Sequence, residues 1–192
     1  VDEVGALVVV IVACIAAVVM PYAKSSIERE VPAERHYLVY TMFLLCLAGL
    51  IGMAVTGDAF NLFVFLEISS LSSYVLISLG ENRRALTASL RYLILGTVGA
   101  TFYVIGLGLV YMMTGSLNMT DLAHLLPAVA GTKTVQVGLA FIVLGFGVKL
   151  AMFPLHVWLP NAYTYAPSAV TAFLAATATK VSVYALMRLI FT

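Results

Sequence analysis

The chain has 192 residues, of which 62% are hydrophobic and only 10% are charged, and its mean hydropathy is +1.07. A soluble protein of this length needs a far more polar surface, so the composition indicates a protein that crosses the membrane several times. The formal net charge of +1 gives no argument for a nucleic-acid partner. The first residues, Val1-Asp2-Glu3, lack the basic segment of a cleavable signal peptide. Since the chain opens abruptly and stops just after an apolar run, we expect a fragment of a longer protein.

The two cysteines give no sign of a metal or redox centre. Cys14 and Cys46 each lie within an apolar run, and neither belongs to a CxxC pair or a Cys/His cluster. We therefore expect two buried thiols, with no disulfide, structural metal or iron–sulfur centre. Haem motifs and nucleotide-binding loops are also missing from the sequence. We expect no cofactor.

Six apolar runs approach the length of about 20 residues that a helix needs to cross the hydrocarbon core. In chain order they are Val4–Tyr22, Tyr37–Thr56, Ala59–Leu79, Leu86–Met113, Val135–Phe153 and Ser168–Phe191. The predicted fold class is therefore all-α, a polytopic membrane bundle of six transmembrane helices. No repeat or soluble domain is visible, so residues 1–192 are predicted to form a single membrane domain.

The links between these runs carry further predictions. A charged loop is expected from Lys24 to His36. In the longer link from residue 114 to 134, we expect Thr120 to cap a short amphipathic helix at the membrane interface. Pro154 cannot donate to a helical hydrogen bond and clashes with the preceding turn, so the fifth helix should break there. Trp158, Tyr163 and Tyr165 are interpreted as interfacial anchors. The small residues of the fourth helix are interpreted as points of close helix approach: Gly96, Gly99, Ala100, Gly106 and Gly108.

Basic residues are distributed unevenly between the two sides of the predicted bundle. One side carries Lys24, Arg29, Arg35, Arg83 and Arg84. The opposite side carries Asp2, Glu3, Asp58, Asp121 and Lys133, with Arg188 near the end of the last helix. The positive-inside rule predicts that the first side is cytoplasmic and that the N-terminus is outside. Arg91 lies further into the fourth helix. Its side chain either extends back to the cytoplasmic face or tunes Glu67 electrostatically. Arg83 and Arg84 either determine the orientation of the chain in the membrane or contact a partner subunit or a lipid head group.

Three ionisable residues, Glu67, Lys149 and Lys180, lie deep within predicted helices. Each falls roughly 12–22 Å from an end of its helix at the usual helical rise, which is near mid-membrane. A charged side chain there costs about 2.5–3.5 kcal/mol, so all three need partners or water. A buried Glu–Lys pair can merely hold helices together. Two lysines and one glutamate leave one positive charge unmatched, however, which favours a proton relay.

His156 follows Lys149 by seven residues and lies just beyond Pro154. With an unperturbed pKa of about 6.5, histidine is suited to proton transfer at neutral pH. The alternative is an interfacial histidine beside Trp158 without such a role. We take Glu67, Lys149, Lys180 and His156 as the candidate residues for proton translocation, and we expect no metal site.

Three stretches resemble a known family. GDAFNLFVFLEISSLSSYVLISLG and YMMTGSLNMTDLA resemble the D-type subunit of Mrp-type multisubunit cation/proton antiporters. GVKLAMFPLHVWLPNAYTYAPSAVTAFLAATATKVSVYAL resembles the proton-conducting module that those antiporters share with respiratory complex I and membrane-bound hydrogenases. The resemblance covers almost the whole chain. Its motifs are specific, because an intramembrane Glu, a Lys-(x)6-His-x-Trp-Leu-Pro run and a later helical Lys rarely occur together by chance.

The resemblance implies that the chain holds one of the family's two inverted repeats, with one broken helix. It further implies that Glu67 is the glutamate that pairs with a lysine, and that Lys149 is the lysine on the broken helix. By the same resemblance, Lys180 is the lysine of the next helix, leading toward the central axis. His156 corresponds to a histidine common in the complex I and hydrogenase versions.

The expected function is a proton- or cation-translocating subunit of an Mrp-type antiporter. It would lie in the cell inner (plasma) membrane and work with other membrane subunits, lipid and protons, with sodium as an open question. Two alternatives remain: an antiporter-like subunit of NADH:quinone oxidoreductase or of a membrane-bound hydrogenase, and a structural subunit that does not transport. We expect no catalytic chemistry of the chain's own, so a redox reaction would belong to the parent complex.

Overall fold

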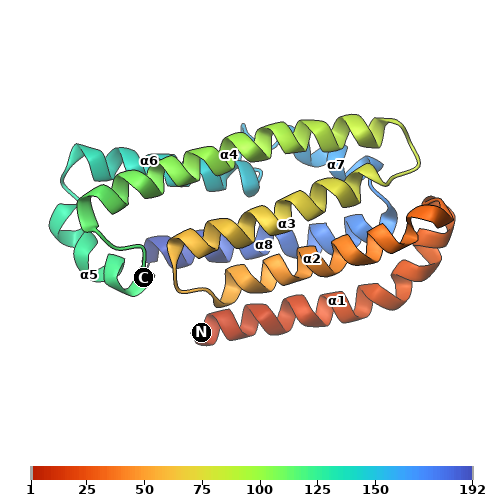
Figure 1. The fold of residues 1–192 in the computed structure, drawn as a ribbon, viewed down its shortest axis with the longest axis horizontal. Coiled ribbons are helices and arrows are strands. Elements are labelled where there is room, and N and C mark those ends of the chain that lie inside the picture. The colour runs from red at the N-terminus through yellow and green to blue at the C-terminus, as the bar shows by residue number, and fades with distance from the viewer. Residues whose placement is uncertain (1, 192) are drawn as a thin grey trace.

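The computed structural model describes residues 2–191, and over that range its regular elements are all helices. The long helices run lengthwise beside one another in an elongated bundle, and α5 lies across one end (Figure 1). The helices are α1 (Glu3–Glu30), the 3-10 turn η1 (Ala33–Arg35), α2 (His36–Val55), α3 (Ala59–Ser78), α4 (Arg84–Thr114), α5 (Met119–Val129), α6 (Lys133–Lys149), α7 (Trp158–Tyr165) and α8 (Ser168–Phe191).

The prediction of a polytopic helical membrane bundle is confirmed. Within the described residues, five helices are long and apolar enough to cross a membrane: α1, α2 together with η1, α3, α4 and α8. The predicted count of six is not confirmed, because α6 has only 17 residues. The α1–α2, α3–α4 and α7–α8 links lie at one end of the bundle (Figure 1), as the grouping of basic loops requires. Which end faces the cytoplasm stays a prediction.

The predicted break in the fifth helix is present, but it begins earlier than Phe153. α6 ends at Lys149, and the chain is not helical again until α7 begins at Trp158. Ala151 has a φ of 53°, the left-handed conformation that commonly ends a helix. The residue before a proline is also disfavoured in the helical region. The break thus places Lys149 on the last turn of α6, and α6 and α7 together lie along α4 (Figure 1).

Three local predictions were wrong. The charged link is helical as far as Glu30, because Ala23, Ser26 and Ile27 are buried and keep the end of α1 packed. The cap of α5 is Asn118, whose side chain accepts from the backbone N–H groups of the next turn, not Thr120. Cys14 is exposed, since it lies on the outer face of α1, whereas Cys46 is buried as expected.

Glycines bring the backbones of α4 and α6 into contact. A Cβ at Gly145 would lie 2.6 Å from the carbonyl oxygen of Gly99, and a Cβ at Gly106 would lie 2.5 Å from that of Gly138. Small residues at such positions let membrane helices approach closely. The interpretation of Gly99 and Gly106 as packing positions is therefore confirmed, and α6 is held firmly along α4. For Gly108 it was wrong, because a Cβ there would meet no atom within 4 Å.

The first and last helices are joined at both ends. Glu30 Oε2 accepts from the backbone N–H of Ser168 at 2.7 Å, and Ser26 Oγ accepts from that of Ala169 at 3.2 Å, so α1 caps the start of α8. At the other end, the Tyr184 hydroxyl donates to Asp2 Oδ1 at 2.9 Å. These contacts fix α8 along the bundle and so set which of its faces turns inward.

Candidate functional site

Lys149 is the last residue of α6, and its side chain is buried between α3 and α4 with 5% of the residue exposed. Its Nζ donates to the hydroxyl of Ser70 and to that of Tyr74, the latter at 3.1 Å. Glu67 Oε1 lies 4.0 Å from Nζ, at the outer limit of an ion pair. The lysine is thus held directly by two neutral hydroxyls, with a carboxylate just beyond hydrogen-bonding distance.

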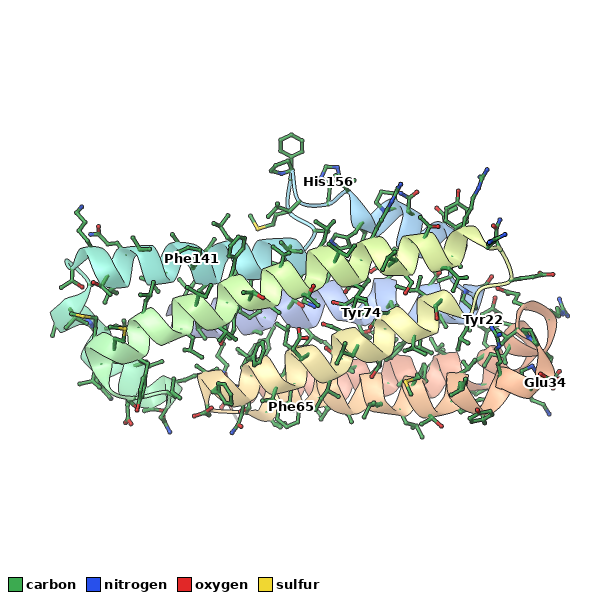
Figure 2. All side chains as sticks on the ribbon, turned by 45° about the horizontal axis from the view of Figure 1, so that its top comes forward. Tyr22, Glu34, Phe65, Tyr74, Phe141 and His156 are labelled. Carbon is green, nitrogen blue, oxygen red and sulfur yellow. The ribbon has the colours of Figure 1, made fainter. Side chains whose placement is uncertain are left out.

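Helical spacing on α3 explains why these partners gather. Glu67, Ser70 and Tyr74 are separated by three and four residues, so their side chains project from one face of the helix. Figure 2 shows Tyr74 within the bundle, well away from its ends. Ser70 Oγ donates to the Leu66 carbonyl of its own helix at 2.6 Å, which leaves its lone pairs free to accept from Lys149.

The carboxylate of Glu67 is under-satisfied. Within residues 2–191, no hydrogen-bond donor reaches its buried Oε1. A buried polar atom without a partner costs about 1–3 kcal/mol, more if it is charged. The nearby Lys149 ammonium is the group that compensates this oxygen, and a small movement of the lysine would bring the two into full contact.

A small polar cavity adjoins Lys149. It measures about 20 Å³ and includes Ser69, Ser70, Ser73 and Ser182 in its lining, with Tyr92 beside them. A space of this size admits one water molecule, which needs polar partners of the kind found here. Because Ser182 belongs to α8, the cavity connects the lysine on α6 with the helix that carries Lys180.

Lys180 itself is not brought to this cluster. Its side chain is exposed, and Nζ donates to the Ala175 carbonyl of the same helix. Ala178 and Ser182 line the cavity, and Lys180 lies midway between them, roughly 200° around the helix from each. Lys180 therefore faces away from Lys149.

His156 lies in the break between α6 and α7, at the outer edge of the bundle and apart from Tyr74 (Figure 2). Its ring centre is 5.7 Å from that of Phe153, which is 87% exposed. Its Nδ1 is buried without a hydrogen bond to any residue that the structure describes. Of the four predicted site residues, the structure brings Glu67 and Lys149 together and leaves Lys180 and His156 apart.

An aromatic column beside Lys149 was missed from the sequence. The Tyr74 ring meets the Tyr92 ring edge-on at 4.6 Å between centres, and Tyr92 stacks on Trp158 at 3.7 Å. Trp158 Nε1 donates to the Val148 carbonyl at 2.9 Å, next to Lys149 in the chain. Trp158 is 2% exposed, so the prediction of an interfacial anchor was wrong. The column ties the start of α7 to the end of α6.

Gly96 makes room for this arrangement. A Cβ at this position of α4 would collide with the Tyr74 hydroxyl, and it would lie 3.4 Å from Lys149 Nζ. The helical spacing of Tyr74 from Glu67 was the available signal for its role. The sequence marked Gly96 as a point of close helix approach, but it could not show that the neighbours are Tyr74 and Lys149, because that contact depends on how the helices meet. No cluster of His, Cys, Asp or Glu that could hold a metal ion occurs among residues 2–191.

Comparison with known proteins identifies the family. Residues 56–192 match the family described as NADH:quinone oxidoreductase/Mrp antiporter, transmembrane. The chain belongs to this family. Membership of the NADH:quinone oxidoreductase/Mrp antiporter family thus agrees with the resemblance of the sequence motifs.

Individual members of the family give the degree of similarity. The chain is 51% identical over 191 residues to NADH-quinone oxidoreductase subunit N of Desulforudis audaxviator, covering 100% of this chain and 38% of that protein. It is 34% identical over 187 residues to the D-type subunit of the Na⁺/H⁺ antiporter of Alkalihalophilus pseudofirmus, covering 97% and 37%. The chain therefore spans less than two fifths of the length of these relatives.

A solved structure supports the same fold. The membrane-bound sulfane sulfur reductase, an archaeal respiratory membrane complex, contains a chain that superposes with a TM-score of 0.75 at 43% identity. The superposition covers 78% of this chain and 31% of that one.

Proposed function

We propose that this chain forms a proton-transfer site of an antiporter-like, proton-translocating membrane subunit, with Glu67 and Lys149 as the working pair. The observation that carries the proposal is a buried lysine on the last turn of a broken helix, held by neutral hydroxyls with a carboxylate 4.0 Å away. The subunit would act in the plasma membrane together with other membrane subunits.

The two sets of partners give the lysine two states. When the ammonium moves onto Glu67, the opposite charge stabilises the protonated lysine. When it rests on Ser70 and Tyr74, no opposite charge is in direct contact. At an effective dielectric constant of 20, the attraction between the two charges grows from about 4 kcal/mol at 4 Å to about 6 kcal/mol at a contact distance of about 2.8 Å. A change of partner thus alters the stability of the protonated lysine by about 2 kcal/mol, which is more than tenfold in its proton affinity.

A proton released by Lys149 needs an acceptor. The cavity beside the lysine leads toward α8, so we expect transfer in that direction. One water in this space would connect Lys149 with Ser182 of α8. Lys180 lies on the opposite face of α8. It would then pass protons onward on the side of α8 that faces away from Lys149. His156 has the weakest structural support as a relay residue, because its ring contacts Phe153 at the edge of the bundle.

The parent complex has two candidates. The sequence motifs favour an Mrp-type cation/proton antiporter. The identity of 51% to an NADH-quinone oxidoreductase subunit N, against 34% to the D-type subunit of an Na⁺/H⁺ antiporter, favours a redox-driven proton pump. Proton transport driven by electron transfer would support the second candidate, and sodium-dependent proton exchange would support the first.

The deciding experiment uses the full-length subunit in native membrane vesicles, with assembly and dye-monitored proton transport measured together. Lys149→Ala should abolish transport and leave the complex assembled. Lys149→Arg should also fail, since arginine remains protonated. The matched control is Lys133→Ala at the exposed start of α6, which should transport normally. Full transport by either Lys149 variant would contradict the proposal and favour a structural subunit.

A further inference from the structure

A pocket between α4 and α7 concentrates positive charge at the end of the bundle that holds the basic links. It measures about 200 Å³ and is lined by Arg84, Thr87, Ala88 and Arg91 of α4 and by Asn161 and Tyr165 of α7. The α4 residues stand at positions i, i+3, i+4 and i+7, so they share one face of the helix. The lining contains two guanidinium groups, an amide and two hydroxyls, and no carboxylate. These groups suit a phosphate, which arginine binds in a bidentate manner.

The two arginines differ in how they are held. Arg84 Nη1 is 3.4 Å from the Tyr165 hydroxyl, and its guanidinium carbon is 6.0 Å from the centre of that ring. Arg91 makes no hydrogen bond or ion pair with any residue in the described range. One guanidinium is thus placed at the pocket by an aromatic neighbour, and the other has its donors available for a ligand.

An apolar groove continues from this pocket. Arg91 also lines a second space of about 150 Å³, together with Ile94, Leu95, Val157 and Trp158. From Arg84 to Leu95 the helix rises by about 16 Å, so the groove lies further into the bundle than the arginine pair. A polar, positively charged pocket followed by an apolar groove matches an anionic head group followed by an acyl chain. A free phosphate would occupy only the first part.

We propose that the α4–α7 groove binds an anionic phospholipid, with its phosphate between Arg84 and Arg91 and one acyl chain along Ile94, Leu95 and Val157. Basic pockets between transmembrane helices commonly bind acidic lipid head groups. Of the acidic residues at this end, Glu30 and Glu81 line a separate space, which shares Tyr165 with the arginine pocket, and neither Glu28 nor Glu34 lines the arginine pocket. Trp158 borders the groove although only 2% of it is exposed, so the lipid would lie next to the residue whose ring packs on Tyr92 beside the Lys149 site.

The test uses the full-length subunit in its complex, transferred into nanodiscs of phosphatidylcholine alone or mixed with phosphatidylglycerol. Native mass spectrometry measures the phosphatidylglycerol retained after detergent extraction. Each surface arginine contributes about 1 kcal/mol, so Arg91→Gln should weaken retention about fivefold and the Arg84→Gln, Arg91→Gln double change about thirtyfold. Arg83→Gln is the matched control, because Arg83 does not line the pocket, and it should retain the lipid normally.

Two further arms separate the sources of the phosphate group. Ile94→Trp fills the groove from an exposed position and should weaken lipid retention while leaving the arginines intact. Inorganic phosphate in place of lipid should not protect the complex against heating. Equal loss of retention in Arg83→Gln, or no loss in the double variant, would overturn the proposal. Protection by phosphate alone would also overturn the proposal, because it would mean a soluble-anion site. So would the finding that a partner subunit covers the groove in the assembled complex.

Discussion

The ammonium of Lys149 lies 4.0 Å from the carboxylate of Glu67, while it donates hydrogen bonds to the hydroxyls of Ser70 and Tyr74. The lysine therefore rests between a neutral and a charged set of acceptors that both belong to α3. Because α3 supplies both sets, the lysine can change partner without any change in helix packing. Single substitutions can therefore remove a hydroxyl acceptor or the carboxylate separately and test the contribution of each.

Glu67 and Lys149 should behave as one functional unit. Glu67→Gln should slow proton transport strongly, and adding it to Lys149→Ala should cause no further loss, because residues in one ion pair do not contribute additively. Transport across a pH series in vesicles, with assembly checked in parallel, measures the coupling. Purely additive effects of the two substitutions would show that the residues act independently.

Tyr74 should matter through its hydroxyl alone. Tyr74→Phe keeps the ring contact with Tyr92 but removes one neutral acceptor, so Lys149 should remain longer on Glu67. A hydrogen bond to a charged group contributes about 1.5–3 kcal/mol, which predicts a rate of transport reduced at least about tenfold. The control is Tyr163→Phe, since the buried Tyr163 hydroxyl bonds to no residue in the described part of the chain. If both variants transport at the same rate, the hydroxyl of Tyr74 has no special role.

Gly96 should tolerate no side chain while Tyr74 is present. Gly96→Ala would push against the Tyr74 hydroxyl, and overpacking of this kind costs about 1–3 kcal/mol of stability. Gly108→Ala on the same helix is the control, because open space surrounds that position. Thermal unfolding of the purified complex measures both. Tyr74→Phe should partly rescue Gly96→Ala; a double variant that is no more stable would argue against the contact.

Trp158 should stabilise the helix break. Trp158→Phe keeps an aromatic ring on Tyr92 but loses the hydrogen bond to the Val148 carbonyl, at a cost of about 1 kcal/mol in the free energy of unfolding. A lowered melting temperature and slower transport would follow, since Val148 precedes Lys149. An unchanged melting temperature and rate would mean that the end of α6 is fixed by other contacts.

The predicted orientation can be tested by labelling. Arg83→Cys, in a variant whose exposed Cys14 is replaced by serine, should react with a membrane-impermeant thiol reagent only after cells are opened. The buried Cys46 should stay unreactive in both cases. Labelling of Arg83→Cys in intact cells would place the basic links outside and reverse the orientation.

The sequence predicted the features that depend on residue type along the chain. The length of the apolar runs predicted the long helices, and Pro154 predicted the break. Glu67 stood out as an acid among apolar residues. The sequence could not show that α6 stops at Lys149, because the end of that helix depends on the left-handed turn at Ala151 and on the buried Trp158. It also could not place Lys180, since the direction of that side chain depends on how α1 holds α8.

The glycine contacts between α4 and α6 limit which motions can operate the site. With Gly145 against Gly99 and Gly106 against Gly138, neither helix can slide or rotate past the other without a clash of backbones. Because the acceptors of Lys149 all belong to α3, its exchange between them needs only rotation about side-chain bonds, which takes picoseconds to nanoseconds where the side chain is free to move and longer where packing confines it. A transport cycle that turns over on the millisecond scale would be limited by events elsewhere in the complex, and the Lys149 site would remain near equilibrium throughout.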